Sequence, residues 1–182
     1  MLASEGKGYG PRSFLYNVGP WYTIGVIYSI AGALRVKSQN FIVIDAHGVG
    51  YKVYFPKTLL DRLPELGQEV RVFCHTHVRE DALDLYGFLN DQQLSFFESL
   101  ISVNGVGPKS ALNIMAVAEI GQLVAAINEG RVDLLTQAGG IGRKTAERVV
   151  LELKGKLTFA DTTATLGAMQ SNMDLEETLV SL

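Results

Sequence analysis

Two glycine-rich segments that each carry a lysine are the residues of this sequence best suited to chemistry. Gly105-Val106-Gly107-Pro108-Lys109-Ser110-Ala111 returns 35 residues later as Gly140-Ile141-Gly142-Arg143-Lys144-Thr145-Ala146. Paired glycines let backbone N–H groups approach an anion closely, and a helix that begins there adds unpaired N–H donors and the positive end of its dipole. Both segments therefore predict phosphate binding.

Helices are expected on both sides of each segment. Apolar residues at helical spacing precede the segments at 94–103 and 132–138, and follow them at 111–117 and 146–157. A helix, a Gly-x-Gly turn and a second helix with a lysine near its start form a helix-hairpin-helix. One copy alone fits a simple tight turn about equally well, whereas two copies in register favour phosphate contacts. Such a hairpin binds the DNA backbone without reading bases.

The predicted DNA contacts lie in the two turns and in the first residues of the helices that follow. They are Gly105, Val106, Gly107, Lys109, Ser110, Gly140, Ile141, Gly142, Arg143, Lys144 and Thr145. Among them, Lys109, Arg143 and Lys144 are the charges best placed to assist, although each also fits an ordinary solvated surface charge. Pro108 suits the first helical turn, where its missing N–H has no consequence.

A nucleotide-binding loop is the main alternative for these segments, because Gly-Pro-Lys-Ser and Gly-Arg-Lys-Thr resemble the end of a Walker A loop. That loop needs glycine directly before lysine, and it should follow a buried strand. Here one residue separates Gly107 from Lys109 and Gly142 from Lys144, and helices are expected before both. ATP binding by this chain is therefore not predicted.

Charge is distributed unevenly along the chain. The 182 residues are 47% hydrophobic and 19% charged, which is typical of a globular protein, and the net charge is −3. Residues 27–90 and 91–157 are each neutral, whereas 158–182 carry acids only. DNA binding is then expected to be local to the hairpins. The single Cys74 excludes an intramolecular disulfide and suits a reducing compartment.

Residues 27–90 follow a period of two, which predicts strands. The expected strands run through 30–36, 41–44, 51–55, 70–78 and 83–87, separated by a turn at 47–50, a helical turn at 59–63 and a charged turn at 79–81. On its apolar face, the first strand should carry Val36 and the fourth Val78. Five short strands with little helix predict a small closed or partly open barrel, and the OB-fold is the leading candidate.

From Asn90-Asp91, a good N-cap pair, the period becomes helical, with a later stripe ended by Gly130 in the C-cap role. The predicted fold class is α+β, a five-stranded OB barrel followed by an all-α domain. The expected divisions are an N-terminal extension at 1–26, the barrel at 27–90, a tandem helix-hairpin-helix domain at 91–157, a flexible linker at 158–173 and the start of a truncated C-terminal helical domain at 174–182.

A membrane-spanning start is the alternative for residues 13–34, which carry no charge and have the length of a span. Ala31-Gly32-Ala33 also resembles the small-residue cleavage site of a signal peptide. However, Asn17 and Pro20 interrupt the stretch, and its later half alternates like a strand. An upstream extension before a first strand is therefore favoured, and no membrane contact is expected.

Two polar groups outside the hairpins suggest other chemistry. Cys74-His75-Thr76-His77 invites a metal interpretation, but strand alternation puts the histidines on one face and the cysteine on the other, and no fourth ligand is evident. No metal, cofactor or catalytic residue is therefore predicted. Glu80 and Asp81 are adjacent carboxylates at a strand tip. Such a pair is usually a solvated turn, but beside DNA it would repel phosphates and steer or separate strands.

Together, these motifs resemble the RuvA family, the bacterial subunits that bind Holliday junctions for branch migration. The resemblance rests on His47-Gly48-Val49-Gly50-Tyr51, Val78-Arg79-Glu80-Asp81, Leu85-Tyr86-Gly87-Phe88, Asn104-Gly105-Val106-Gly107-Pro108-Lys109 and Gly140-Ile141-Gly142-Arg143-Lys144-Thr145-Ala146-Glu147-Arg148. It runs from about Ile27 to Leu157. It implies a cytoplasmic homotetramer, or a pair of tetramers, that holds a four-way junction open during DNA recombination and repair.

The resemblance also implies roles for the predicted residues. The two hairpins would grip the minor-groove backbones of the junction arms, and Glu80 and Asp81 match the acidic pins at the central crossover. The chain would be a non-catalytic subunit, with RuvB as the ATP-driven motor that contacts the third domain and the RuvC resolvase as a further partner. The alternative function is a generic duplex-binding module of another repair protein.

Three departures from the family pattern carry expectations of their own. Residues 1–26 have no counterpart in the family. Ser29 and Ala31 stand where members often carry basic residues, and Gly139 replaces a usual proline, so some DNA contact or hairpin rigidity should be reduced. Only the beginning of the third domain is present, so a chain ending at Leu182 would keep junction binding while its coupling to the motor is impaired.

Overall fold

The structure is a computed structural model that describes residues 27–157. The predicted extension, linker and C-terminal helix start lie outside the described residues. The strands are β1 (Ser29–Lys37), β2 (Phe41–Ala46), β3 (Val49–Tyr54), β4 (Glu69–Val78) and β5 (Leu83–Phe88). The helices are the 3-10 helix η1 (Lys57–Arg62), α1 (Asp91–Ile101), α2 (Pro108–Met115), α3 (Ile120–Glu129), α4 (Val132–Leu135) and α5 (Arg143–Leu153).

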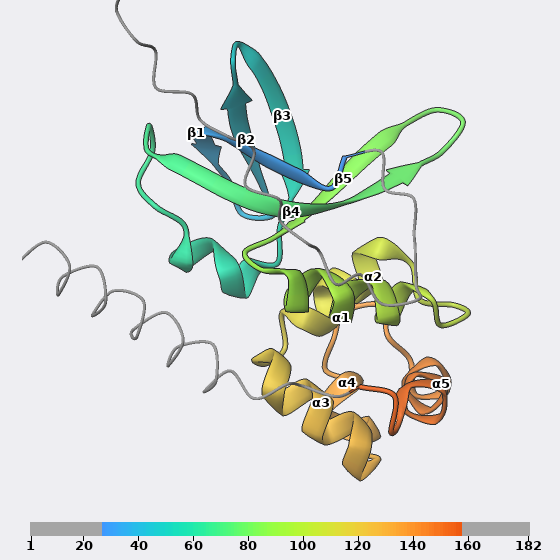
Figure 1. The fold of residues 1–182 in the computed structure, drawn as a ribbon. Coiled ribbons are helices and arrows are strands. Elements are labelled where there is room, and N and C mark those ends of the chain that lie inside the picture. The colour runs from blue at the N-terminus through green and yellow to red at the C-terminus, as the bar shows by residue number, and fades with distance from the viewer. Residues whose placement is uncertain (1–26, 158–182) are drawn as a thin grey trace, which may run out of the picture.

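The five strands close into a barrel in the order β1-β2-β3-β5-β4, which confirms the predicted architecture. All neighbours are antiparallel except β3 and β5, which run parallel and pair only through Val53 with Leu85 and Tyr54 with Tyr86. The period of two arises because alternate side chains enter the barrel, where Leu34, Ile42 and Ile44 are fully buried. Figure 1 shows the barrel on one side of the molecule and the helices on the other.

The first strand departs from simple alternation. Its pairing with β2 shifts register between Leu34 and Val36, so that Val36 turns outward and is 40% exposed. The expectation that Val36 shares the buried face is therefore wrong, because a bulge moves every later side chain to the other face. Gly32 faces β2 so closely that an added Cβ would lie 2.2 Å from the carbonyl oxygen of Asp45. The segment that resembles a cleavage site thus lies inside β1.

A two-residue turn joins β2 to β3. His47 (φ 54°) and Gly48 (φ 87°) both have positive φ, which is the conformation that tight hairpins require. The predicted turn at 47–50 is shorter than expected, since Val49 already belongs to β3. The backbone N–H of Gly48 donates to Asp45 (2.8 Å), and this bond, together with the Arg35 guanidinium, holds the pKa of Asp45 below its usual value.

The hairpin of β4 and β5 extends beyond the body of the barrel (Figure 1). Val78 and Leu83 pair across this hairpin and continue the face that is buried further down, yet they are 62% and 55% exposed. Val78 was expected on the buried face, and that expectation is wrong because the barrel ends before it. The acidic turn lies immediately beyond this pair.

Helix α1 connects the barrel to the other helices. Its N-cap is Asn90, whose side chain accepts from the backbone N–H of Gln93 (2.9 Å), as the N-cap prediction requires. Phe97 is fully buried and packs on Phe88 and Tyr86 from β5, with ring centroids 4.9 and 5.4 Å apart. The barrel and the helices therefore share one hydrophobic core.

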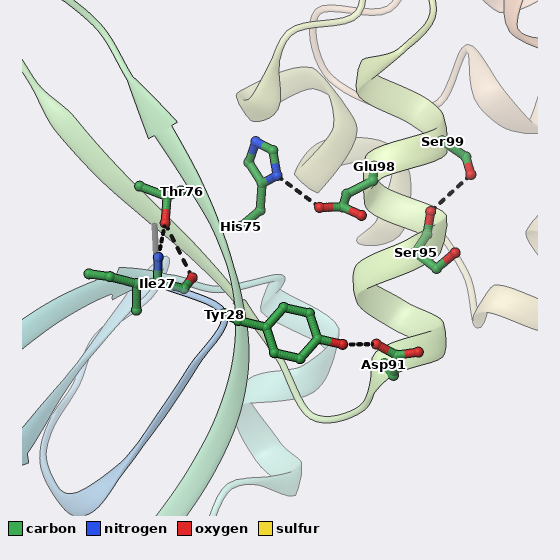
Figure 2. A network of polar contacts seen from close by, with 8 residues as sticks. All are labelled: Ile27, Tyr28, His75, Thr76, Asp91, Ser95, Glu98 and Ser99. Carbon is green, nitrogen blue, oxygen red and sulfur yellow. Dashed lines mark hydrogen bonds and ion pairs between the residues drawn. The ribbon is translucent and has the colours of Figure 1, made fainter. Parts of the chain in front are cut away.

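Polar contacts also cross this boundary, as Figure 2 shows. The Nδ1 atom of His75 on β4 lies 3.1 Å from a carboxylate oxygen of Glu98 on α1. The hydroxyl of Tyr28 donates to Asp91, the first residue of α1. His75 is buried by this arrangement, which satisfies its ring nitrogen with a partner from the neighbouring element.

The later helices follow the predicted pattern with shorter ends. Helix α3 stops at Gly130, whose φ of 78° confirms the C-cap prediction. Helix α5 was expected to reach 157 but ends at Leu153, because Lys154 leaves the helical conformation and Gly155 has a φ of 75°. Within residues 27–157 no single helix is long and apolar enough to cross a membrane, and α2 with α3 meets that test only as a pair bent by 101°.

Candidate nucleic-acid interface

The two glycine-rich segments adopt the same backbone turn. In the first, the N–H of Val106 donates to the carbonyl of Val103 (3.0 Å), and in the second Ile141 donates to Ala138 in the same way (3.1 Å). Gly105 and Gly140 occupy equivalent places with φ of 90° and 84°. These values lie in the left-handed region that favours glycine, which is why both copies need it there.

The second glycine of each segment is the N-cap of the following helix. Gly107 precedes α2 and Gly142 precedes α5, both in extended conformation, and neither helix start receives a hydrogen bond from a side-chain cap. An added Cβ on either glycine would meet no atom within 4 Å, so the space at the side-chain position of both N-cap residues is open. Each terminus therefore presents backbone N–H donors and a positive dipole end outward.

The repeat extends into the core. Leu100, Ala111 and Ile114 of the first copy are fully buried, and so are Leu135, Ala146 and Val149 at the same offset in the second. Val106 and Ile141 are only 5% and 6% exposed. These two predicted contact residues hold the turns in place with their side chains, and only their backbone is available to a ligand.

The cationic side chains stand at the starts of α2 and α5. Lys109, Arg143 and Lys144 are all exposed. Arg143 donates to Glu147 one turn later (3.0 Å), but both side chains are solvated, so this pair contributes little to stability. Neither Lys109 nor Lys144 forms an ion pair with another residue of 27–157. Both lysines are therefore available to an anionic ligand.

The two hairpins are hydrogen-bonded to each other in a reciprocal way. Asn113 on α2 donates through Nδ2 to the carbonyl of Gly139 (2.7 Å), the residue before the second turn. Arg148 on α5 donates through Nη1 to the carbonyl and the side-chain oxygen of Asn104 (3.0 and 3.3 Å), the residue before the first turn. The donors occupy equivalent positions of the repeat, and so do the acceptors.

The predicted acidic residues lie apart from the hairpins, at the tip of the β4–β5 ribbon. Glu80 and Asp81 are both exposed, and neither forms an ion pair with another described residue. The neighbouring Arg79 donates to Asp84 (3.1 Å) and so leaves the two carboxylates uncompensated. This tip would repel phosphates, while the helix starts attract them.

The histidine and cysteine cluster does not form a ligand set. Cys74 points into the barrel, where burial raises the pKa of its thiol to about 12, while His75 faces α1 and His77 packs against the ring of Tyr86. No group of three or more metal-ligating side chains gathers anywhere in residues 27–157.

Sequence reasoning missed the residues that join the hairpins. Asn104 and Arg148 lie inside the segments that carry the family resemblance, but the sequence assigns neither of them a role. Asn113 is neutral and lies outside those segments, so spacing within one copy gives no reason to choose it. A signal was present in the repeat itself, because Asn104 and Asn113 share its 35-residue offset with Gly139 and Arg148.

Known proteins share both parts of this architecture. The family model described as the RuvA N-terminal domain matches residues 27–87, and the model of a SAM-like helix-hairpin-helix tandem matches 97–156. The protein of Dehalococcoides mccartyi named Holliday junction branch migration complex subunit RuvA is 42% identical over 158 residues, which is 86% of this chain and 81% of that protein.

Two further relatives carry the same name. The protein of Albidiferax ferrireducens is 42% identical over 160 residues, covering 86% of this chain and 83% of its own length. The protein of Geobacter sulfurreducens is 45% identical over 136 residues, covering 75% of this chain and 68% of its own length.

Proposed function

The chain belongs to the RuvA family, and we propose that it binds four-way (Holliday) DNA junctions as a subunit of a branch-migration complex. The observation that carries this proposal is the pair of identical turns, each followed by an uncapped and open helix start with an exposed lysine. Two such starts bind two backbone phosphates without reading bases. A junction is defined by its shape, so it calls for this kind of contact.

Within this function, the hairpins bind the backbones of the junction arms. The N–H groups around Gly107 and Gly142 are the expected phosphate donors, assisted by Ser110 and Thr145 at the helix starts. Lys109, Arg143 and Lys144 add charge that makes the binding sensitive to salt. Val106 and Ile141 support the two turns from the core.

The acidic tip would act at the centre of the junction. Glu80 and Asp81 lie in the turn between β4 and β5. The hairpin of these two strands extends beyond the barrel (Figure 1). Their uncompensated charge disfavours phosphates at the tip, so the strands at the crossover are kept apart while the arms are held by the hairpins. This division of attraction and repulsion supports an open junction.

The assembly expected here is the one that the family resemblance implies. Four copies, or two sets of four, would surround the four arms in the cytoplasm, where bacterial DNA lies. The chain itself would not hydrolyse ATP, and a RuvB motor would supply the energy through the region that begins at 174, with the RuvC resolvase as a further partner. Ser29 and Ala31 add no charge to β1, so DNA contact there would be weak.

The decisive experiment compares two DNA molecules of equal length. In a gel-shift assay with size measurement, the wild-type chain should bind a four-way junction more tightly than a linear duplex, and the complex should contain four or eight copies. Equal affinity for both DNA molecules would favour a generic duplex-binding module instead. Lys109→Glu should weaken junction binding, whereas Lys57→Glu, which reverses one charge on η1 outside both hairpins, is its charge-matched control and should not.

A further inference from the structure

We propose that Asn113 and Arg148 are positioning residues that hold the two phosphate-binding turns at a fixed separation, so that both turns bind DNA as one unit. This inference rests on the proposed function. It concerns residues that need not touch DNA themselves, and it gives a role to a neutral side chain that no motif identifies.

The geometry of the reciprocal hydrogen bonds carries the inference. Asn113 lies on α2, the second helix of the first hairpin, and its Nδ2 donates to the carbonyl of Gly139 before the second turn (2.7 Å). Arg148 lies on α5, the second helix of the second hairpin, and its Nη1 donates to the carbonyl of Asn104 before the first turn (3.0 Å). Each hairpin therefore holds the turn of the other, and the pair of bonds has an approximate two-fold relation.

The two acceptor residues lie directly before the turns, so their position sets the position of the phosphate-binding residues that follow. Asn104 directly precedes Gly105, and Gly139 directly precedes Gly140, so each bond fixes the peptide that enters a positive-φ turn. The turns also lie against the opposite hairpin. A Cβ built on Gly105 would lie 3.8 Å from Nη1 of Arg148, and one built on Gly140 would lie 4.0 Å from Oγ of Ser110.

A fixed separation matters because two phosphates on a DNA backbone have a fixed separation too. Preorganised donors avoid the entropy cost of ordering two mobile turns at the moment of binding. If one turn shifts, its helix start and its lysine lose their phosphate even though their charge remains. A loss of this kind differs from the loss of a charge, and the difference can be measured.

Asn113→Ala is the sharpest test, because it removes a bond to the second turn without changing any charge. The dependence of junction affinity on salt counts the phosphates that the protein neutralises. We expect Asn113→Ala to lower junction affinity by about tenfold, the effect of losing one hydrogen-bonded constraint, and to lower the salt slope by about one. Asn113→Gln retains an amide donor and should recover part of both quantities.

Asn128→Ala is the matched control. Asn128 lies at the end of α3, and its side chain accepts from the N–H of Gly155 (3.0 Å), away from both turns. Asn128→Ala removes the same type of side chain and one bond between an amide side chain and the backbone, although Asn128 accepts this bond and Asn113 donates its own. Because the Asn128 bond does not hold either turn, the variant should keep the wild-type affinity and salt slope. Thermal unfolding of both variants reports any loss of general stability.

The possible outcomes distinguish the positioning role of Asn113 from the proposed junction binding on which it rests. A wild-type chain that does not prefer a junction would overturn the proposed function. If the wild-type chain does prefer it, an Asn113→Ala variant with unchanged affinity and slope would overturn the positioning role. The role would also be overturned if Asn113→Ala lost affinity only in proportion to its thermal stability while keeping the wild-type slope.

Discussion

The two hairpins have the same backbone and the same buried positions, but they are supported in different ways. The first begins with α1, which packs on β4 and β5 through Phe97 and Glu98. The second begins with α4, a four-residue helix that packs among the other helices. The first hairpin is therefore fixed to the barrel, whereas the second is held by its neighbours in the helical part.

The hairpins also differ in charge at matching positions. Where the first copy has Pro108 and Asn113, the second has Arg143 and Arg148. The same turn therefore occurs in a less charged hairpin that packs on the barrel and in a more charged hairpin that packs among the helices. The first copy is thus attached to the barrel, and the second copy carries more of the positive charge.

Charge reversal should reveal this division most strongly. Replacing both Lys109 and Lys144 with Glu should weaken junction binding on the order of 100-fold and flatten its salt dependence, because two charged contacts to phosphate are lost and replaced by repulsion. Lys144→Glu alone should cost more than Lys109→Glu, since the new carboxylate would also neutralise the adjacent Arg143. Titrations of labelled junction at several salt concentrations give both quantities, and unchanged binding of the double variant would show that the hairpins do not contact DNA.

The N-cap glycines test whether both helix starts approach phosphate. Gly107→Ala and Gly142→Ala fit the backbone, because both residues have negative φ and open space for a Cβ. We expect about tenfold weaker junction binding for each, since the methyl group stands in front of the N–H donors, with a stability cost of about 0.5 kcal/mol. Junction affinity and denaturant unfolding should be measured on the same samples. Normal affinity in one variant alone would mean that only the other hairpin binds.

Replacing the turn glycines should reduce the free energy of unfolding more clearly than it reduces junction affinity. Gly105→Ala and Gly140→Ala force a side chain into the left-handed region and should lower the free energy of unfolding by about 1 kcal/mol each. The two losses should be similar because the turns are equivalent, and urea denaturation measures them directly. A much smaller loss for Gly140→Ala would indicate that the less supported second turn adapts to the substitution.

The acidic tip provides the contrast with both hairpins and the smallest expected effect. Glu80→Gln with Asp81→Asn should leave junction affinity within about threefold of the wild type, or tighten it, because these exposed carboxylates repel phosphate through solvent. The separation of strands at the crossover, followed with a fluorescent base analogue, should decrease. A large loss of affinity would instead make the two residues part of the scaffold.

Much of this architecture could be predicted because its signals are local. Strand alternation, the N-cap at Asn90, the C-cap at Gly130 and the repeated turns all depend on residues close together in the sequence. The errors arose where tertiary structure ends a pattern. A bulge turns Val36 outward, and the barrel ends before Val78.

The candidate site also has a part that local sequence predicts and a part that depends on tertiary packing. Its glycines and lysines are visible in each copy, so the turns and their ligand class could be predicted. The bond from Asn113 to Gly139 spans 26 residues, and the bond from Arg148 to Asn104 spans 44. No rule of local spacing brings such residues together, because their contact depends on how two hairpins pack.

The chain is synthesised from its N-terminus, so the reciprocal bonds can form only after the second hairpin has been made. All five strands are complete at Phe88, so the barrel can close while the helices are still being made. The first hairpin has its own residues by Met115, but its partners emerge only with Gly139 and Arg148. On the ribosome, a chain halted between these points would hold all five strands and a first hairpin that lacks both of its hydrogen-bond partners in the second.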